Sequence, residues 1–230
     1  MEEALFADTF SFWEKITEED KRSILEGSVT AEYKKGQLMH RSDMKCQGAM
    51  IVLSGVLRVY IVSEEGREVT LFRIYANDSC VLSASCLLDT IAFDVLIEPS
   101  EDVHVVMVPT TVLFPVMNKN PYVELYMYKK AAERFSDVMW TVQQILFMGT
   151  DKRIAVFLWD EMHRQGQPML KITHDEIAKN IGSAREVVTK VLKYFAEERI
   201  IILKRGKLEI ANKKALQKLT INSNKNISHM

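Results

Sequence analysis

The chain has 230 residues, of which 47% are hydrophobic, and its 30 Lys and Arg against 31 Asp and Glu leave a net charge of −1. This length exceeds that of the usual single domain and can fill two modest cores. No run of about 18 apolar residues is present, and the N-terminus, MEEALFADTF, lacks the basic start and apolar core of an export signal, so we expect a cytoplasmic protein with no membrane partner. The three cysteines, Cys46, Cys80 and Cys86, are too few and too unevenly spaced for a disulfide framework.

Short apolar runs alternate with turn signals between about residues 30 and 108. The run 56–62 lies between Ser54-Gly55 and Glu64-Glu65-Gly66, which is the pattern of a strand between two turns. Further runs of the same character lie at residues 49–53, 69–74, 93–97 and 103–108. Their spacing is close to that of antiparallel sandwiches and barrels, so the N-terminal part is predicted to be mostly β.

A long helix is predicted after Asn120, because no Gly or Pro interrupts the helical pattern from there to about Met148. A shorter helical piece lies between Pro109 and Pro121. Seven apolar residues of the long helix recur at alternating spacings of three and four, which makes a heptad seam: Leu125, Tyr128, Ala132, Phe135, Met139, Val142 and Leu146. Such a seam favours pairing with the same helix of a second subunit; packing of the whole stripe within one chain is the alternative.

Two short helices that meet at a glycine are predicted within residues 173–201. Gly149 and Thr150 form a predicted hinge, and a helix opened by Asp151 leads into this region. Thr173 and Glu176 form a capping box that starts the first helix, and Gly182 can adopt the positive φ that ends it. Ser183 and Glu186 form a second possible capping box, so the second helix is expected to begin directly after the glycine.

The second helix is predicted to be amphipathic, with one apolar and one charged face. Its apolar residues are Val187, Val188, Val191, Leu192 and Phe195, and its exposed ones are Arg185, Glu186, Thr189, Lys190 and Lys193. Arg can donate a bidentate pair to guanine, Glu can accept from cytosine, and Lys can reach guanine or phosphate, so this face fits a DNA major groove. The alternative is a helical hairpin with a solvated face, in which Glu186 only caps Ser183.

A β-hairpin with a basic tip follows Arg199. Two apolar runs, 200–203 and 208–210, flank Lys204-Arg205-Gly206-Lys207. A strand pair after the second helix is a wing, whose Arg205 and Lys207 would lie near phosphates; an ordinary hairpin with a polar turn is the alternative. The tail 221–230, rich in Asn and Ser, is expected to be disordered.

The charge of the chain is divided between its two parts. Residues 150–230 hold 16 cations and 9 anions, a net of +7, whereas residues 1–149 hold 14 cations and 22 anions, a net of −8. A basic C-terminal part attracts polyanions and an acidic remainder does not. The division therefore indicates two domains, of which one has a nucleic-acid surface.

The order of a β domain, a long helix, a hinge and a winged helix-turn-helix resembles the Crp/Fnr family of bacterial transcription regulators over essentially the whole chain. The motif that carries the resemblance is Thr173-x-x-Glu176-Ile177-Ala178, Gly182, Arg185-Glu186 and Lys190, with Lys152-Arg153-Ile154-Ala155 upstream. The resemblance implies an α+β protein. Its expected parts are a cyclic-nucleotide-binding-like β jelly-roll (double-stranded β-helix) effector domain in residues 1–120, a dimerisation helix and hinge in 121–149, a winged helix-turn-helix DNA-binding domain in 150–220 and a flexible tail in 221–230.

The same resemblance implies how such a chain would act. It implies a homodimer that reads a palindromic operator in double-stranded DNA, with half-sites roughly 34 Å apart, and RNA polymerase as a protein partner. Residues 185, 186 and 190 would read bases, with Thr173, Ser183, Thr189 and Lys193 beside them. The family more often has Arg where Lys190 stands, and Lys lacks the fork that selects guanine bidentately.

The resemblance also implies an effector site, although this chain departs from the cyclic-nucleotide pattern there. Members that bind cyclic nucleotides carry Gly-Glu for the ribose and Arg-Ser or Arg-Thr for the phosphate in the stretch that corresponds to residues 77–93. That stretch has no Arg here, and Asp94 would repel a phosphate, so we do not expect cAMP to bind. The candidate pocket residues are Ser79, Cys80, Ser83, Ser85, Cys86 and Phe93.

The identity of the effector stays open on the sequence. The serine hydroxyls suit a neutral or carboxylate ligand, Cys80 and Cys86 suit a redox sensor, and His40 and His104 suit haem or a metal; ordinary small and polar packing residues are the alternative reading of all of them. Regulation by DNA binding alone, without a ligand, is a further possibility. We find no nucleophile–base pair, metal triad or phosphate loop, so we do not expect an enzyme.

Overall fold

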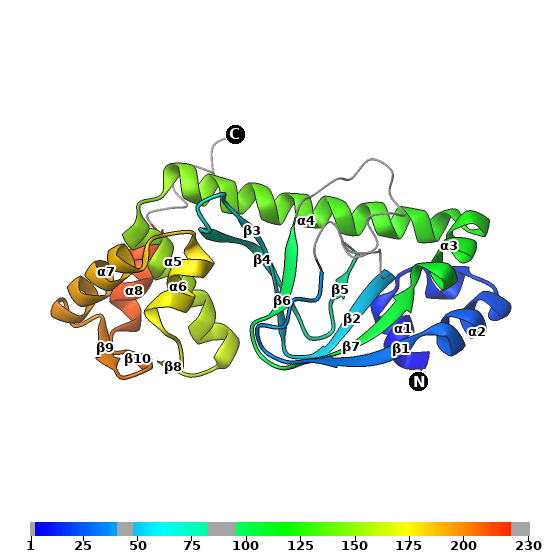
Figure 1. Ribbon diagram of the computed structural model, residues 1–230. Coiled ribbons are helices and arrows are strands. Elements are labelled where there is room, and N and C mark those ends of the chain that lie inside the picture. The colour runs from blue at the N-terminus through cyan, green and yellow to red at the C-terminus, as the bar shows by residue number, and fades with distance from the viewer. Residues whose placement is uncertain (1–2, 41–47, 82–94, 222–230) are drawn as a thin grey trace. The chain divides into compact units, whose positions relative to one another are not determined.

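The computed structural model describes residues 3–40, 48–81 and 95–221. The chain forms two compact units: one comprises residues 1–61 and 71–139, and the other comprises 62–70 and 140–230. Figure 1 labels the elements of both. In the described part of the chain, no helix has both the length and the apolarity that crossing a membrane requires.

The first unit is built on two antiparallel sheets, which confirms the predicted β jelly-roll. One sheet has the order β1-β7-β2-β5, from β1 (Val29–Tyr33), β7 (Val103–Pro109), β2 (Gly48–Ser54) and β5 (Ser79–Cys80). The other has the order β4-β3-β6, from β4 (Glu68–Tyr75), β3 (Val56–Val62) and β6 (Leu96–Pro99); the last residue of β3 and the first three of β4 are counted with the second unit. The run predicted over 93–97 is β6, which begins at Leu96; residues 93 and 94 lie outside the described residues.

Strand β2 reads as a continuous apolar run because both of its faces are covered. Met50 and Val52 are fully buried in the core shared with Leu57 and Val59 of β3. Ile51, whose side chain points to the other face, is buried in a second core beneath helices. A strand covered on both faces loses the alternation of polar and apolar residues that a half-exposed strand shows.

The helices that cover this second core are α1 (Glu3–Thr9), the 3-10 helix η1 (Trp13–Lys15), α2 (Glu18–Gly27) and α3 (Thr110–Lys119). Helices α1 to α3 lie together beside the β1-β7-β2-β5 sheet (Figure 1). Aromatic side chains fill their interface with the sheet: Phe6, Phe10, Phe12 and Trp13 are at most 1% exposed. Only α3 is predicted from the sequence.

Helix α4 (Pro121–Phe147) is the long helix predicted from the heptad pattern. Its buried side, Val123, Tyr126, Met127 and Ala131, joins the core of the first unit. The predicted seam is on the uncovered side: Phe135 is 56% and Leu146 is 67% exposed, Leu125, Tyr128, Ala132 and Met139 are also exposed, and Val142 is half-buried. Among the described residues, six of the seven seam residues are therefore exposed, and Val142 alone is partly covered.

Within residues 150–221, the winged helix-turn-helix domain contains four helices and a three-stranded sheet. Its helices are α5 (Thr150–Gln165), α6 (His174–Ile181), α7 (Arg185–Glu197) and α8 (Lys213–Ile221), and its sheet has the order β8-β10-β9, from β8 (Met169–Leu170), β10 (Lys207–Ile210) and β9 (Ile201–Lys204). Helix α5 begins one residue before the predicted Asp151, with Gly149 as its N-cap. Ile154, Leu158, Ile177, Leu192 and Phe195 are fully buried in the shared core.

Helix α6 begins and ends as its sequence predicts. The Thr173 hydroxyl accepts from the Glu176 amide at 3.2 Å, and the Glu176 carboxylate accepts from the Thr173 amide at 2.8 Å, which completes the capping box. At the other end Gly182 has a φ of 63°, a conformation that glycine adopts without the steric cost of a side chain. Two local signals therefore define this helix.

Removing the cap hydroxyl should loosen the first turn of α6. Thr173→Ala leaves amides of that turn without an acceptor and should cost about 1 kcal/mol of local stability, whereas Thr173→Ser keeps the hydroxyl. Hydrogen exchange measured by mass spectrometry should show amides 174–177 exchanging roughly fivefold faster in Thr173→Ala, since about 1.4 kcal/mol corresponds to tenfold. Equal exchange rates in the Ala and Ser variants would show that the cap does not stabilise α6.

Candidate nucleic-acid interface

Helix α7 begins without the predicted second capping box. Its N-cap is Ala184, which provides no side-chain cap, and its first residue is Arg185. Ser183 lies too early to cap it, because its amide still donates to the Ala178 carbonyl, at 3.0 Å, in the turn that ends α6. The carboxylate of Glu186 is therefore not needed for a capping box, and it lies exposed in the first turn of α7, where negative charge is favourable.

The two faces of α7 are separated as predicted, with one exception. Val188, Leu192 and Phe195 are fully buried and Val191 packs beside them, but Val187 is 40% exposed. The prediction of Val187 as a core residue was wrong, since a helix turns about 100° per residue and Val188 already occupies the centre of the buried face.

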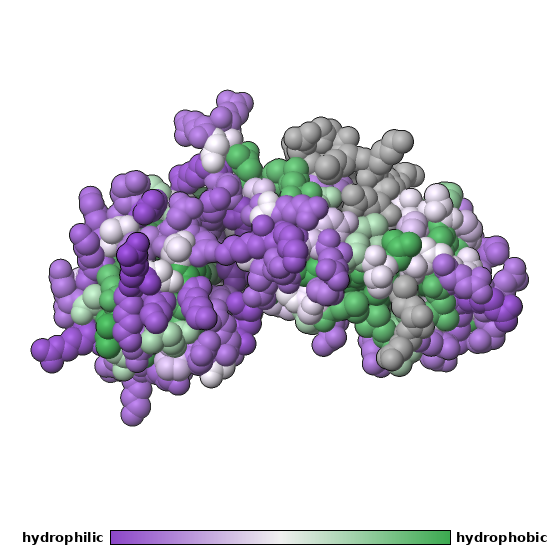
Figure 2. All heavy atoms as spheres, turned by 60° about the horizontal axis from the view of Figure 1, so that its bottom comes forward, coloured by the Kyte–Doolittle hydropathy of each residue, from purple (hydrophilic) through white to green (hydrophobic). Residues whose placement is uncertain are grey.

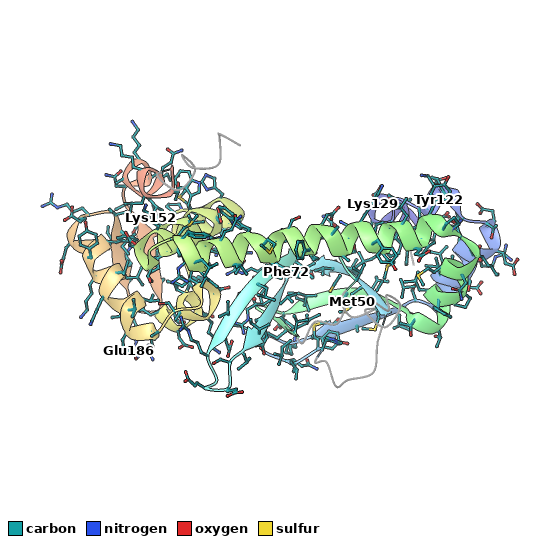
Figure 3. The ribbon with its side chains drawn as sticks, turned by 90° about the horizontal axis from the view of Figure 1, so that it is seen from above. Met50, Phe72, Tyr122, Lys129, Lys152 and Glu186 are labelled. Carbon is teal, nitrogen blue, oxygen red and sulfur yellow. The ribbon has the colours of Figure 1, made fainter. Side chains whose placement is uncertain are left out.

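The other face of α7 carries the predicted reading residues. Arg185, Glu186, Lys190 and Lys193 are exposed and Thr189 is half-buried. Figure 3 shows Glu186 at the outer side of the domain, and Figure 2 shows mostly hydrophilic side chains over the part of this domain that it displays. The face therefore presents three cationic donors, Arg185, Lys190 and Lys193, and the carboxylate acceptor of Glu186 to solvent.

Thr189 has a partner that the sequence analysis did not single out. The Nδ1 atom of His174, the first residue of α6, lies 3.0 Å from the Thr189 hydroxyl. Burial of the imidazole, together with the positive charge of Arg185, lowers the pKa of His174. The two residues are 15 positions apart, so only the packing of α6 on α7 brings them together.

A buried arginine attaches α6 to α5. Arg153 is 9% exposed, and its guanidinium donates to the Ile181 carbonyl at 2.6 Å and to the Thr150 hydroxyl at 3.3 Å. The Ile181 carbonyl belongs to the last turn of α6, where the helix dipole favours a cation. Arg153 therefore holds the end of α6 just before the turn that leads to α7.

The predicted wing is formed by β9 and β10, which pair antiparallel with Lys204 opposite Lys207. Arg205 and Gly206 make the tip, and Arg205 and Lys207 are exposed. Lys204 forms an ion pair with Glu209 at 2.6 Å, so its charge is partly neutralised. Lys204, Arg205 and Lys207 are all exposed, and Lys204 differs from the other two in its ion pair with Glu209.

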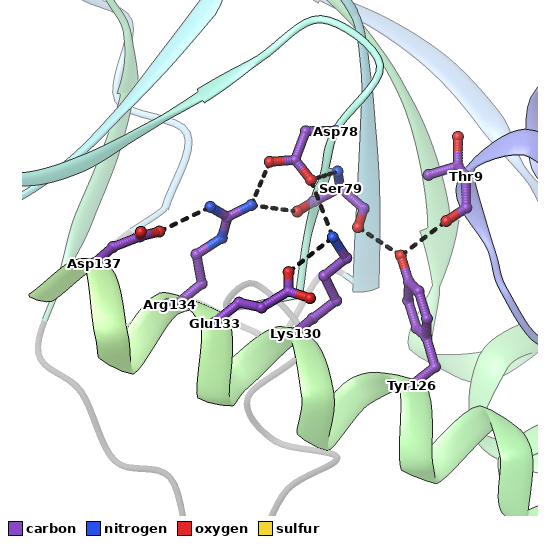
Figure 4. Close-up of polar contacts among 8 residues, drawn as sticks. All are labelled: Thr9, Asp78, Ser79, Tyr126, Lys130, Glu133, Arg134 and Asp137. Carbon is purple, nitrogen blue, oxygen red and sulfur yellow. Dashed lines mark hydrogen bonds and ion pairs between the residues drawn. The ribbon is translucent and has the colours of Figure 1, made fainter.

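The predicted effector residues are described only in part. Ser79 and Cys80 are each 1% exposed, while Ser83, Ser85, Cys86 and Phe93 lie outside the described residues. The Ser79 hydroxyl lies 2.6 Å from the Tyr126 hydroxyl of α4, which in turn donates to the Thr9 carbonyl at 3.3 Å (Figure 4). The site is therefore joined to α4 by a buried hydrogen bond.

Helix α4 also brings cations to this site. Asp78 accepts from Arg134 and lies 3.4 Å from Lys130, whose ammonium also contacts Glu133 at 3.0 Å (Figure 4). Burial alone would raise the pKa of Asp78, but the hydrogen bond and charge of Arg134 outweigh burial and lower it. The guanidinium also lies over the ring of Phe72, which Figure 3 labels. Lys130 and Arg134 lie far along the chain from the predicted pocket residues, 79–93, so the sequence did not predict these cations.

The two histidines considered as haem or metal ligands have different surroundings. His40 is 5% exposed, its Nδ1 atom has no hydrogen-bond partner among the described residues, and burial lowers its pKa. The side chain of His104 is 54% exposed and lies 3.5 Å from Glu32. Within residues 3–40, 48–81 and 95–221, no group of three or more His, Cys, Asp or Glu is arranged to hold a metal ion.

Comparison with known proteins agrees with the fold and with the helix-turn-helix. The family model of the Crp-like helix-turn-helix domain matches residues 152–219. The chain is 26% identical over 179 residues to the transcriptional regulator SdrP of Thermus thermophilus, which covers 73% of this chain and 81% of that protein. The structure of FixK2 from Bradyrhizobium japonicum, 17% identical, has the same fold, with a TM-score of 0.68 over 84% of this chain and 96% of that one.

A nearer relative is a transcriptional regulator of the Crp/Fnr family from Eubacterium rectale, whose crystal structure has been solved. It is 41% identical to this chain, with a TM-score of 0.88, and the match covers 92% of this chain and 98% of that one. These relatives are regulators of transcription and not enzymes. The chain belongs to the Crp/Fnr family of transcriptional regulators.

Proposed function

We propose that this chain acts as a homodimer that reads a palindromic operator with α7 and controls transcription in response to a small effector. The observation that carries the proposal is the exposed face of α7, where Arg185, Glu186, Thr189 and Lys190 project from a helix whose opposite face is buried. A helix held in this way can enter the major groove without disturbing its own core.

The side chains of this face differ in what they can recognise. Arg185 can donate two parallel hydrogen bonds to the O6 and N7 atoms of guanine, and Glu186 can accept from the amino group of cytosine. Lys190 is a flexible point charge, so it discriminates less sharply between guanine and phosphate. We assign Thr173, the N-cap of α6, Ser183, in the turn between the two helices, and Lys193 of α7 to sugar–phosphate contacts, which fix the register of the helix.

Arg185 and the wing should contribute in different ways. Arg185→Ala should lose roughly 1–3 kcal/mol of affinity for the selected operator and relax the preference at one base position. Arg205→Ala and Lys207→Ala should weaken binding to all sequences alike and reduce the slope of affinity against salt by about one each. Selection of duplexes from a random pool, followed by fluorescence anisotropy at several salt concentrations, measures both effects.

Arg185→Lys is the matched control, because it keeps the charge and loses the fork. It should resemble Arg185→Ala in base preference and the wild type in salt dependence. If Arg185→Ala selects the same consensus sequence as the wild type, Arg185 does not read a base. Sequence-dependent losses in the wing variants would contradict their assignment to phosphate.

The homodimer is supported by the uncovered seam of α4. Leu125, Tyr128, Phe135, Met139 and Leu146 are between 40% and 67% exposed, although each is apolar and follows the heptad spacing. A surface of this kind is stable in water when another apolar surface covers it, and the same seam from a second copy has the matching period. A two-fold pair would carry two copies of α7, as a palindrome with half-sites roughly 34 Å apart requires.

A charge in the middle of the seam should separate the subunits. Phe135→Glu buries a carboxylate between the helices of a dimer and should shift analytical ultracentrifugation from dimer to monomer, with operator affinity falling at least tenfold, or about 1.4 kcal/mol. Ser136→Glu is the control, since Ser136 is exposed and off the seam. A dimer that persists in Phe135→Glu would show that the interface lies elsewhere.

The effector is proposed to act beside β5, where Asp78 and Ser79 contact α4 through Arg134 and Tyr126 (Figure 4). A ligand that changes these contacts would favour one packing of α4 over another. Because α4 also carries the proposed dimer seam, a change in its packing can alter the orientation of the two α7 helices. Cys80 is 1% exposed, and buried thiols react poorly with oxidants. Ser79 is equally buried, so the partly exposed charged groups of Asp78, Lys130 and Arg134 are the better candidates for contact with the ligand.

Cyclic AMP is not the expected effector, because the cations near Ser79 are already neutralised. Lys130 and Arg134 contact three carboxylates, those of Asp78, Glu133 and Asp137. An additional phosphate there would meet excess negative charge. Titration calorimetry should show no heat of cAMP binding in the wild type, whereas Asp78→Asn, which leaves two carboxylates for the two cations and removes the excess negative charge, tests whether Asp78 is the cause. Micromolar binding to the wild type would contradict this expectation.

A further inference from the structure

We propose that His174 is a positioning residue for DNA reading: it holds the hydroxyl of Thr189 in the reading face of α7, and its protonation state decides whether that hydroxyl donates or accepts in the groove. The inference rests on the proposed function of α7. It adds a residue from the first helix of the motif to the determinants of base preference, and it makes operator binding depend on pH.

The geometry supports an indirect action of His174. Thr189 lies four residues after Arg185 and four before Lys193, so it belongs to the same stripe of α7 as two exposed cations. The imidazole reaches it from the first residue of α6, with Nδ1 3.0 Å from the hydroxyl oxygen. Both side chains are half-buried. The pair therefore lies at the boundary between the core of the domain and the surface assigned to DNA.

The hydrogen-bond inventory of the pair limits what Thr189 can offer to a base. A neutral imidazole has one donor and one acceptor nitrogen. We assign the hydrogen of the neutral ring to Nε2, so that Nδ1 accepts and the threonine hydroxyl must donate to it. Only the oxygen lone pairs of Thr189 then remain, and these suit the amino groups of cytosine and adenine. A protonated imidazole donates from both nitrogens, so the Thr189 hydrogen becomes free for an acceptor such as guanine O6 or thymine O4.

The charges around His174 favour the neutral ring in the free protein. Burial and the positive charge of Arg185, from α7, both lower its pKa. On its own helix, Asp175 is exposed and Glu176 is directed to the cap of Thr173. The charged group that α5 brings to α6, Arg153, contacts the opposite end of the helix at Ile181. Burial and the charge of Arg185 therefore both favour the neutral ring in the free protein.

Bound DNA should change this balance. The phosphates bring negative charge close to the ring, which favours the protonated form, so the pKa of His174 should be higher in the complex than in the free protein. Binding then takes up as much as one proton per subunit. Affinity should rise as the pH falls from above the pKa of the complex, and it should level off below the pKa of the free protein.

The test is the affinity for the selected operator, measured by fluorescence anisotropy at constant ionic strength from about pH 8.5 to about pH 5.5, a range that brackets the ordinary pKa of histidine. The wild type should bind several-fold more tightly at the acidic end. His174→Gln keeps a group that can hydrogen-bond to Thr189 but does not titrate, so its affinity should vary much less with pH. A pH dependence equal to that of the wild type in His174→Gln would overturn the proposal.

Thr189→Val is the matched partner variant, because valine keeps the shape of threonine and removes the hydroxyl. If His174 acts through Thr189, then His174→Ala and Thr189→Val should each relax the selected consensus at the same base position, and the double variant should lose little more than either single one. Fully additive losses, or changes at different positions, would overturn the positioning role. Circular dichroism and thermal unfolding of each variant exclude a general loss of folding.

The outcome for Arg185→Ala separates this proposal from the function on which it rests. If that variant alters the consensus and the His174 and Thr189 variants do not, α7 reads DNA and only the role of His174 fails. If the Arg185, Thr189 and His174 variants all bind the operator as the wild type does, α7 is not the reading helix and the proposed function fails as well.

Discussion

The left-handed conformation of Gly182 is the constraint on which the helix-turn-helix depends. It ends α6 and sets the direction in which α7 leaves the turn, so it determines which residues of α7 can face DNA. Arg153 supports this turn by donating to the Ile181 carbonyl, one residue before the glycine. Because Arg153 is itself buried on α5, the orientation of α7 is defined by the core of the domain. A surface loop would not fix it as closely.

Helix α4, like α7, has one face buried in a core and one face exposed. Its buried residues, such as Val123 and Met127, belong to the core of the first unit, and the exposed heptad seam lies on the opposite side. Arg134 extends from α4 to Asp78 of the β domain, where burial makes an unpaired charge costly. One helix therefore combines an apolar contact with the core, a charged contact with Asp78 and an exposed apolar seam.

What the sequence could predict follows from the range of the interactions involved. The capping box of α6, the glycine that ends it and the heptad seam all depend on residues within a few positions of each other, and each was predicted. The capping box at Ser183 was wrong, because the turn after Gly182 uses the Ser183 amide and α7 begins two residues later. Helices α1 and α2 were missed, since their aromatic residues become a core only when the sheet lies beneath them.

The polar contacts between different elements could not be predicted from the sequence for the same reason. Asp78 and Arg134 are 56 residues apart, Ser79 and Tyr126 are 47 apart, and His174 and Thr189 are 15 apart, so no periodic pattern connects them. Each pair joins two elements, and the energy of each depends on burial that only the folded chain provides. An interaction of this kind can be altered by a bound ligand, a proton or DNA without unfolding either element. The contacts that are hardest to predict from the sequence are therefore the ones best placed to regulate this protein.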